Sequence, residues 1–415
     1  MLEARRVSYC GRAAVSLSND SVRTVVDLKG GVVPEFSLRR GKAGLNAHWA
    51  PPFRGTGGAP WPESGGADYW GGRLLHDIAG DFPCSPGFCP AAKVDGADIP
   101  PHGWTANEEW KLCGIGRARD AACAGFSLDS PAPSMPLSWK KRDMVLGGRN
   151  AYYTVLDIEN RGERSISVNV ARHNTLGSPF LESGCRISLA AKRFAVPPLG
   201  TEFDDTGRLA PGAEFESLGD APLRSGGRAD IGEVPGMIGF TDFVTGPIPR
   251  DAELGWSCVV NPRLALAYLC FFPGPAAART GEIALSFNDL WMQYGGRDFT
   301  PWALHEGGAD RTFCLGTENA VGAYANGLQY SREHPELMGA PTTVPVPARS
   351  KLRLLYGVAL LELPRELAEE GVRRVEARGP EVVLIGSKAS AGFALEADFE
   401  RIRSLADSPL ELQAP

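Results

Sequence analysis

Short runs of β-branched and aromatic residues, separated by glycine, proline and asparagine, predict a chain built mainly from β-strands. The first clear case joins the runs at 23–28 and 32–38 through Gly30 and Gly31, two residues that tolerate a positive φ. We therefore expect an antiparallel hairpin at this place.

A second pattern of strand, turn and strand covers residues 152–158 and 165–171, with Asn160-Arg161-Gly162 as the turn. From Ile166 onward, alternate residues are apolar and the residues between them are more polar. Because side chains alternate between the two faces of a strand, His173 continues the polar face if the strand runs on. We expect this histidine at a strand end, pointing away from the core.

Further strands and two helices follow from the same reasoning. The strands are expected at 186–189, 257–260, 264–272, 282–287, 312–315 and 352–361. A helix is expected at 364–376, which starts with proline and places acidic residues before arginines, and a shorter one near 398–405. Because strands and helices do not alternate as they do around a parallel sheet, the predicted fold class is all-β.

One domain, residues 1–415, is the preferred organisation because the chain has no repeat of fixed period, no low-complexity block and no clear linker. Within it, residues 41–110 hold few periodic stretches but many glycines, prolines and aromatic residues. We interpret this segment as a loop insertion that forms one wall of a ligand site. Residues 364–415 are interpreted as a C-terminal extension of helices and strand.

Composition narrows the classes of partner. The net charge of −6 and the isoelectric point near 5.7 offer no broad basic surface, so no nucleic-acid partner is expected. No apolar run approaches the ~20 residues that cross a bilayer, and the first residues lack the apolar segment of a secretion signal. We expect a cytoplasmic protein without a membrane partner, and the oligomeric state is left open.

Cysteine usage and motif searches exclude several chemistries. The nine cysteines are an odd number in apolar surroundings, which favours buried thiols over a disulfide framework. Cys84 and Cys89 are the only close pair, and without a second pair at ligand spacing we expect no metal site. The chain lacks a Walker sequence, a Gly-x-Ser-x-Gly elbow and a His-Glu-x-x-His helix. We therefore expect no cofactor.

Four short segments remain as candidates for chemistry. They are His102-Gly103-Trp104, His173-Asn174-Thr175, Trp291-Met292-Gln293 and Leu315-Gly316-Thr317-Glu318. Taken alone, each has an ordinary structural explanation, since a tryptophan is more often in the core, a lone carboxylate is usually at the surface, and a histidine fits either role. Their joint order along the chain is what favours a functional interpretation.

In this order and spacing, the chain resembles the galactose mutarotase-like superfamily, from Asp27-Leu28-Lys29-Gly30-Gly31 to the strand near Leu352. The resemblance implies a β-supersandwich, a large pair of antiparallel sheets that holds a sugar in an open groove. It also implies aldose 1-epimerase activity, in which an acid and a base interconvert sugar anomers without a metal or cofactor. The implied partner is a small-molecule sugar or sugar derivative.

The resemblance also assigns roles to individual residues. Glu318, in a Leu-Gly-x-Glu context, looks like the family's catalytic base, and His173 looks like its general acid. The implied substrate-binding residues are Arg73, His102, Gln293 and, with poorly matching neighbours, Asp242. Trp104 and Trp291 would add apolar platforms for the sugar ring. The residues that follow His173 and Glu318 depart from the usual pattern of the family, so the sugar is not identified.

Interconversion of anomers needs a base that removes the proton of the anomeric hydroxyl and an acid that protonates the ring oxygen. A carboxylate at Glu318 and an imidazolium at His173 supply these functions, and each such group typically contributes ~10²–10⁴ in rate. Because direct pairing would neutralise both groups, we expect them to lie apart, on either side of C1 and O5 of the sugar. His102 and Arg73 are expected to hold substrate oxygens.

Two other functions stay open. The first is a carbohydrate-binding protein that uses the same groove without turnover, since a fold does not determine a function. The second is a polysaccharide lyase or glycosidase, although such enzymes usually carry secretion signals and additional domains. The presence of both His173 and Glu318 favours the epimerase.

Overall fold

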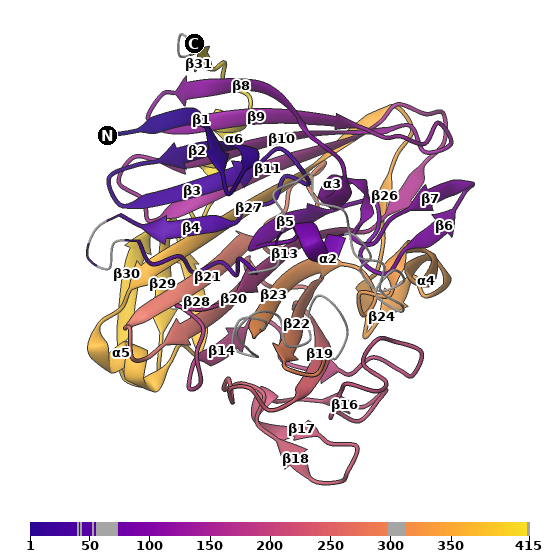
Figure 1. Ribbon diagram of the computed structural model, residues 1–415, viewed down its shortest axis with the longest axis vertical. Helices are drawn as coiled ribbons and strands as arrows, with labels where there is room; N and C mark the ends of the chain where they lie inside the picture. The colour runs from indigo at the N-terminus through magenta and orange to yellow at the C-terminus, as the bar shows by residue number, and fades with distance from the viewer. Residues whose placement is uncertain (40, 42–43, 52–53, 55–73, 298–312, 413–415) are drawn as a thin grey trace.

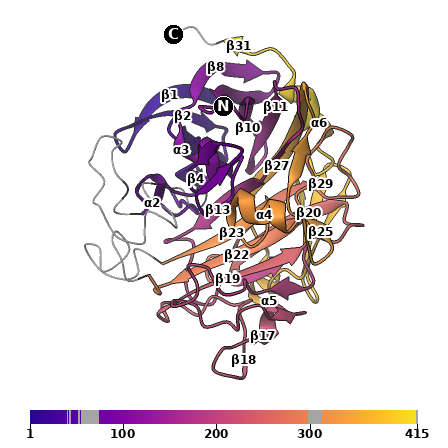
Figure 2. The ribbon, with the colours of Figure 1, turned by 90° about the vertical axis from the view of Figure 1, so that its right-hand side faces the viewer.

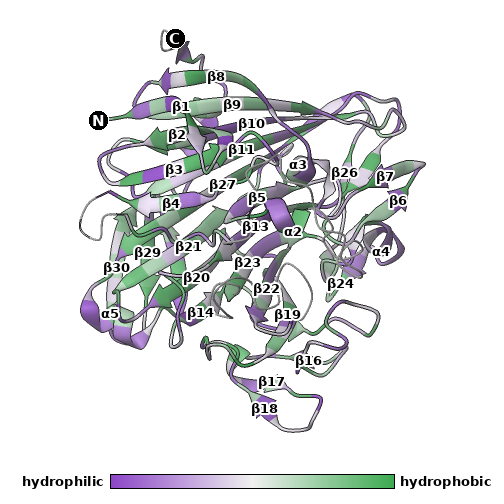
Figure 3. Ribbon diagram, viewed as in Figure 1, coloured by the Kyte–Doolittle hydropathy of each residue, from purple (hydrophilic) through white to green (hydrophobic). Residues whose placement is uncertain are grey.

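The chain folds into stacked antiparallel sheets (Figure 1). The computed structural model describes residues 1–412 except 40, 42–43, 52–53, 55–73 and 298–312. The strands carry most of the apolar residues, whereas helix α5 (Arg365–Glu370) is mainly hydrophilic (Figure 3). The predicted all-β class, with a large antiparallel β-sandwich, is confirmed.

One layer is a nine-stranded antiparallel sheet. In spatial order its strands are β14 (Arg186–Leu189), β20 (Leu254–Asn261), β21 (Leu266–Pro273), β27 (Ser350–Glu362), β11 (Ala151–Asn160), β10 (Leu137–Leu146), β9 (Ala121–Asp129), β8 (Lys111–Ala118) and β31 (Glu411–Leu412). The long strand β27 lies near the middle and is apolar and buried over most of its length, as expected for a strand covered on both faces.

The second layer combines a seven-stranded and a four-stranded sheet. The former is ordered β16 (Glu214–Phe215), β15 (Phe194–Ala195), β19 (Phe240–Pro247), β22 (Phe287–Tyr294), β23 (Cys314–Val321), β13 (Val170–Leu176) and β5 (Asp81–Cys84). The latter contains β1 (Glu3–Tyr9), β2 (Arg12–Ser18), β3 (Val22–Asp27) and β4 (Glu35–Leu38). Isolated bridges from Val33 to Asp81 and from His48 to Leu176 join the two sheets, and Figure 2 shows β13, β23, β22 and β19 in succession.

Polar contacts as well as hydrophobic packing hold the two layers together. The guanidinium of Arg172 on β13 forms an ion pair with Asp81 on β5, and both side chains are fully buried. The hydroxyl of Tyr152 on β11 donates to the same carboxylate at 2.7 Å, so this hydrogen bond crosses between the layers. Asn174 donates to the hydroxyl of Tyr356 on β27 at 2.8 Å. Buried polar contacts of this kind help to specify how the sheets register against each other.

The C-terminal segment covers the outer face of the nine-stranded sheet. It contains α5, the three-stranded sheet β28 (Arg374–Arg378), β29 (Glu381–Ile385) and β30 (Ser390–Ala394), and helix α6 (Glu400–Ala406). The ring of Phe399 packs 5.5 Å from that of Phe271 on β21, and the hydroxyl of Tyr153 on β11 donates to the carbonyl of Leu395 at 2.9 Å. One continuous hydrophobic cluster therefore extends from Ala4 to Leu405.

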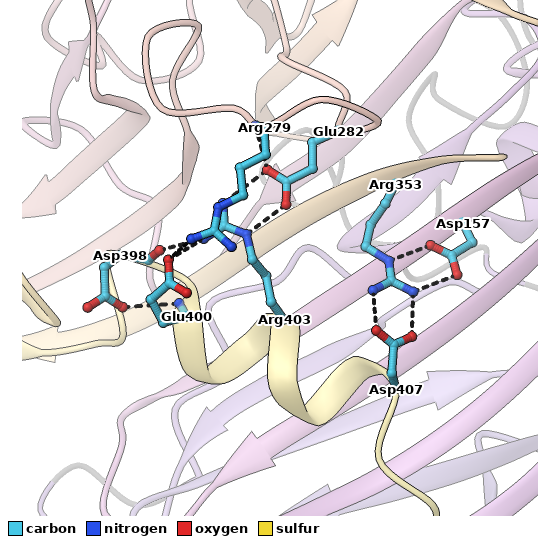
Figure 4. Close-up of polar contacts among 8 residues, drawn as sticks. All are labelled: Asp157, Arg279, Glu282, Arg353, Asp398, Glu400, Arg403 and Asp407. Atoms are coloured by element: carbon cyan, nitrogen blue, oxygen red, sulfur yellow. Dashed lines mark hydrogen bonds and ion pairs between the residues drawn. The ribbon is translucent and has the colours of Figure 1, made fainter.

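Ion pairs at the edge of this contact also fasten α6 to the sheet (Figure 4). Arg353 on β27 binds Asp157 with one side of its guanidinium and Asp407 with the other, at 2.6–2.9 Å. Arg403 on α6 makes two hydrogen bonds to Glu282 at 2.7 and 3.0 Å. Bidentate arginine–carboxylate contacts fix the geometry of an ion pair more strictly than single hydrogen bonds do.

Short elements connect the layers. They are α2 (Leu74–Asp77), β6 (Ala92–Val94), β7 (Ala97–Ile99), α3 (Gly103–Asn107), β12 (Ile166–Val168), η1 (Leu218–Asp220), β17 (Ala221–Pro222), β18 (Arg228–Ala229), α4 (Gly327–Glu333), β24 (Glu336–Leu337), β25 (Ala340–Pro341) and β26 (Val344–Val346). Among the described residues, no helix has the length and apolar character needed to cross a membrane. The nine cysteines form no disulfide bond, and seven of them are buried.

Several predicted elements match the structure. The hairpin of β3 and β4 pairs Val22 with Leu38 and turns at Gly30 and Gly31, whose φ values are 69° and 57°. A side chain at Gly30 would lie 2.4 Å from the carbonyl oxygen of Ala106, so both the backbone angle and the close approach require glycine. The predicted strand at 186–189 is β14.

Other predicted elements are wrong in position or type. Residues 282–286 lie in a connection, and the strand β22 begins only at Phe287. This strand was missed because its mixture of polar and aromatic residues shows no clear period. The segment 41–110 is not a simple loop insertion, since it supplies β5, β6, β7 and α3, elements too short to show a period. The helix predicted at 364–376 ends at Glu370, where Gly371 takes a φ of 77°.

Candidate functional site

A row of side chains crosses five neighbouring strands on the face of the seven-stranded sheet that points away from the nine-stranded sheet. The register places Phe82 on β5 opposite His173 on β13, Asp289 on β22 opposite Glu318 on β23, and Thr245 on β19 opposite Asp289. His173 and Glu318 complete the row because their side chains are in contact. Directly opposed residues of antiparallel strands share a face, so one row collects groups from distant parts of the chain.

The alternation of β13 explains how a polar strand serves two layers. Arg172 and Asn174 point toward the nine-stranded sheet, where they form the interlayer contacts described above. His173 lies between them and points to the opposite face. It was predicted at a strand end, but it occupies the middle of β13 and is only 4% exposed. The direction predicted for this side chain, away from the core between the sheets, agrees with the structure.

The side chains of His173 and Glu318 are in direct contact. Nε2 of His173 lies 3.2 Å from Oε1 of Glu318, and Nδ1 lies 3.0 Å from the hydroxyl of Thr175. Phe82 stacks on the imidazole with a centroid distance of 4.5 Å and an interplanar angle of 16°. The second carboxyl oxygen, Oε2 of Glu318, is buried and has no hydrogen-bond partner among the described residues. Nδ1 of His173 thus has a partner, whereas Oε2 of Glu318 is left for a donor from a ligand.

Burial determines where the proton of this pair resides. It lowers the pKa of His173 well below 6.5, and the neighbouring His102 lowers it further. Burial also raises the pKa of Glu318 well above 4.5, with added repulsion from Asp289 and Glu202. Both shifts favour a carboxylic acid beside a neutral imidazole, and the proton that this pair can pass on is the one on the carboxyl group.

This geometry corrects the expectation that His173 and Glu318 lie apart, as carboxylate and imidazolium. Their strands are neighbours, with Arg172 opposite Asn319 and Thr175 opposite Gly316, so the two side chains face each other across one strand spacing. Opposed Cβ atoms in antiparallel strands are ~5 Å apart, which leaves no room for a sugar between unmoved side chains. Burial, rather than the contact, favours the uncharged forms of both groups.

His102 approaches the pair from the connection after β7. It takes a φ of 60° immediately before α3, and the next residue, Gly103, has a φ of 76° and packs against the carbonyl of Ser85. Its ring lies 5.1 Å from that of His173, edge to face, and its Nδ1 is 3.5 Å from the sulfur of Cys84. Burial and the charge of Arg297 lower its pKa to about 3, so it is neutral at physiological pH.

These groups line a cavity of about 510 Å³, counting the space open to solvent. Its polar lining includes His102, His173, Glu202, Arg297 and Glu318, and its apolar lining includes Phe203, Phe243 and Trp291. An apolar pocket with a few convergent polar groups is the usual form of a small-molecule site.

Glu202 and Arg297 were not predicted from the sequence. They form a buried ion pair in the cavity wall, and the guanidinium lies over the ring of Trp291 at 4.9 Å. Burial raises the pKa of Glu202, while Arg297 opposes that shift. Arg297 comes directly after the glycine pair that follows Trp291 and Gln293, which is the one signal that could have drawn attention to it.

Several predicted binding residues lie elsewhere. Trp104 is a core residue, because its indole donates to the carbonyl of Asp98 at 3.2 Å and meets Trp139 edge to face. Asp242 is engaged by Arg208 and accepts two backbone N–H groups, so it stabilises a loop. Gln293 is fully buried and accepts from the hydroxyl of Thr241, outside the cavity.

The last two predictions concern Arg73 and metal binding. Arg73 lies outside the described residues. Within the described part of the chain, no three histidine, cysteine, aspartate or glutamate side chains are grouped as metal ligands would be. The candidate site therefore consists of His102, His173, Trp291 and Glu318, which the fold brings together, and of the ion pair of Glu202 and Arg297.

Comparison with known proteins adds structural relatives only. No protein-family model and no curated protein sequence matches the chain. A structure from Klebsiella pneumoniae that carries the provisional name aldose 1-epimerase is similar over 86% of this chain and 81% of its own, with a TM-score of 0.60 and 12% identity. A galactose mutarotase-like protein from Clostridium acetobutylicum is similar over 87% and 99%, with a TM-score of 0.53 and 11% identity.

A galactose mutarotase related enzyme from Lactobacillus acidophilus is similar over 84% of this chain and 97% of its own, with a TM-score of 0.52 and 9% identity. Likeness at such low identity concerns the path of the backbone and leaves the substrate and the activity of this chain undetermined. The resemblance seen in the sequence is thus confirmed at the level of the fold. The chain has the galactose mutarotase-like fold, as a divergent example of it.

Proposed function

We propose that the protein interconverts the anomers of an aldose or a modified sugar, as an aldose 1-epimerase does. The observation that carries the proposal is the pair of His173 and Glu318, 3.2 Å apart, in the lining of a cavity with aromatic walls. A pair that holds a single proton contains one acid and one base, which is what anomer exchange requires. Among the described residues, neither group forms an ion pair with a lysine or an arginine.

The proposed reaction keeps its proton balance within this pair. In the first step Nε2 of His173 takes the proton of the anomeric hydroxyl, the bond from C1 to the ring oxygen breaks, and the carboxyl of Glu318 protonates the ring oxygen. Rotation about the bond between C1 and C2 exposes the other carbonyl face, and the two proton transfers reverse on closure. The assignment implied by the resemblance, with Glu318 as base, is the other tautomer of the same pair.

The cavity walls supply binding rather than proton transfer in this proposal. Trp291 and Phe243 offer apolar surfaces for the C–H face of a sugar ring. His102, neutral and next to His173, can hydrogen-bond a substrate oxygen. Glu202 and Arg297 together present an acceptor and donors to sugar hydroxyls.

The test is anomer exchange followed by NMR across a panel of aldoses, uronates and sugar phosphates. Glu318→Gln and His173→Asn are each expected to reduce the exchange rate by ~10²–10⁴-fold, because each removes one partner of the proton transfer. Matched controls are Glu369→Gln and His334→Asn, which alter exposed side chains on α5 and after α4. Exchange that survives both site substitutions unchanged would reject the proposal.

The pH dependence follows from the two shifted groups. Acid adds a second proton at His173, whose pKa is depressed by burial, and alkali removes the proton from Glu318, whose pKa is raised by burial. Activity should therefore be constant between these two pKa values and decline outside them, giving a broad bell in kcat/KM. A profile with a single rising limb near the ordinary pKa of histidine would contradict the assignment.

A second function, recognition of a sugar without turnover, is favoured by one observation. His173 and Glu318 already contact each other, and a ligand has to separate them before either can act. The two functions differ in one measurement, which is saturable binding of a sugar by calorimetry without accelerated exchange of its anomers. That result would support the binding protein and remove the epimerase.

A further inference from the structure

Asp289 is a second buried carboxyl beside Glu318, and it does not line the cavity. It lies directly opposite Glu318 in the register of β22 and β23, so both side chains share the face of the sheet that carries the site. Both residues are buried, with exposures of 0% and 1%. The row of side chains thus continues behind Glu318, away from His173.

Only one of the two carboxyl oxygens of Asp289 accepts a hydrogen bond from the described residues. Its Oδ1 accepts a hydrogen bond from the hydroxyl of Thr245 on β19. Its Oδ2 and the Oε2 of Glu318 are both buried without a hydrogen-bond partner among the described residues. A buried carboxyl oxygen without a donor favours protonation of its group, and two such groups side by side cannot both ionise readily.

We propose that Asp289 is a positioning residue that keeps the proton of the pair on Glu318, by forming with it a carboxyl dyad that ionises in two separate steps. Asp289 loses its proton first, and its negative charge then opposes ionisation of Glu318. The dyad does not depend on which ligand the cavity binds. Its effect on catalysis, however, rests on the proposed function.

Other charged or titratable groups face Glu318, and none of them can replace Asp289. His173 on β13 is neutral, and His102 near α3 is neutral as well. Cys84 on β5, Cys89 and Cys314 on β23 are buried thiols with strongly raised pKa values, so they carry no charge. Glu202 is compensated by its ion pair with Arg297. Asp289 is the neighbouring carboxyl that has no cation among the described residues.

The electrostatics support two separate ionisation steps. Burial raises the pKa of Asp289 to about 7, against the opposing effect of the hydrogen bond from Thr245. Burial raises the pKa of Glu318 well above its ordinary value, and the charge of Asp289 is the next largest cause. In a coupled pair of acids the first ionisation belongs to the group with the better donor, which is Asp289. The negative charge of an ionised Asp289 therefore opposes ionisation of Glu318.

The dyad can be observed without an assay of activity. Carboxyl carbons labelled with ¹³C at Asp γ and Glu δ positions are followed by NMR through a pH titration of the full chain, with Glu318 and Asp289 assigned by loss of their signals in Glu318→Gln and Asp289→Asn. Asp289→Asn keeps the size of the side chain and its acceptor for Thr245. We expect it to lower the titration midpoint of Glu318 by about one pH unit or more, because it removes a neighbouring negative charge.

The same NMR titration of the wild-type chain tests the dyad even if Asp289→Asn does not fold. The Asp289 signal should change in two steps, the second at the midpoint of Glu318, because interacting acids report each other's ionisation. In Glu318→Gln it should change in one step. An unshifted Glu318 midpoint in folded Asp289→Asn, or a wild-type Asp289 signal that is insensitive to Glu318, would overturn the dyad.

The catalytic consequence has its own readout. If anomer exchange is observed, the alkaline limb of kcat/KM should move to lower pH in Asp289→Asn by the same amount as the Glu318 midpoint. A shifted midpoint with an unmoved alkaline limb would show that the dyad exists but does not control the rate. A shifted midpoint without exchange of any sugar would leave the dyad standing and reject the epimerase.

Discussion

Glycine at position 316 makes the contact between His173 and Glu318 possible. Gly316 lies between Thr175 and Trp291 in the register, on the same face as the row of polar side chains. A Cβ atom there would lie 2.6 Å from Oε1 of Glu318 and 3.0 Å from Cβ of Trp291. The missing side chain therefore makes room for the carboxyl group.

Gly316→Ala should displace the carboxyl of Glu318 while leaving the fold in place. Because a misplacement of ~1 Å can cost 10²-fold in rate, we expect exchange to fall by about that factor. Overpacking of this kind typically costs ~1–3 kcal/mol of unfolding free energy, measurable from urea denaturation. Gly125→Ala on β9 is the matched control, since the nearest atom to its Cβ would be 4.0 Å away. An active, fully stable Gly316→Ala would contradict this account of the site.

Individual residues were partly predictable. The order of His102, His173, Trp291 and Glu318 indicated a site, and the fold brings these four together around one cavity. Trp104 was grouped with them, but nothing in its local sequence distinguishes a core tryptophan from a cavity tryptophan. That difference is decided by which strands lie opposite it.

At the scale of the strands, the buried ion pair of Arg172 and Asp81 joins the site to the core. It links β13, which carries His173, to β5, which carries Phe82. The hydroxyl of Tyr152 donates to the same oxygen of Asp81 from the other layer. A buried pair of this kind is costly to assemble and much more costly to leave half broken.

Asp81→Asn should cost ~3–5 kcal/mol of unfolding free energy, because it leaves the guanidinium of Arg172 buried without a counter-charge. The comparison is Asp407→Asn, which breaks an ion pair whose carboxylate is 69% exposed, and which should cost ~1 kcal/mol or less. Both values follow from chemical denaturation of the purified variants. Equal costs for the two substitutions would mean that burial does not govern these pairs.

Strands were predictable where their pattern was strong and short-range. The hairpin of β3 and β4 and the strand β14 show regular alternation, and both were located correctly. β5 spans four residues, and β22 mixes Asn288 and Asp289 with aromatic residues, so neither shows a clear period. Their strand character comes from partners far away in the sequence.

At the scale of the whole molecule, the C-terminal segment behaves as a further layer of one core. Phe399 packs on Phe271 of β21, and Ile402 and Leu405 of α6 are fully buried in the same cluster. Ion pairs of Arg353 and Arg403 border this contact (Figure 4). We propose on this basis that residues 1–415 form a single cooperative domain.

Phe399→Ala should lower the unfolding free energy by ~3–5 kcal/mol, since it removes a fully buried aromatic ring from this interface. In a single cooperative domain, circular dichroism and tryptophan fluorescence should report the same lowered midpoint in urea. The exposed Phe240→Ala on β19, at 40% exposure, is the control and should shift the midpoint far less. A separate early transition in Phe399→Ala would instead show that the C-terminal segment unfolds independently.

The sequence by itself determined the all-β class, the turns around glycine pairs, and the set of chemically capable residues. These features depend on side-chain alternation and backbone freedom, which act over a few neighbouring residues. Only the tertiary structure decided that His173 touches Glu318, that Asp289 lies behind it, and that Glu202 and Arg297 complete the cavity. Those relations depend on which strands pair across the sheet and on how burial shifts protonation, and neither is encoded in any short stretch of the chain.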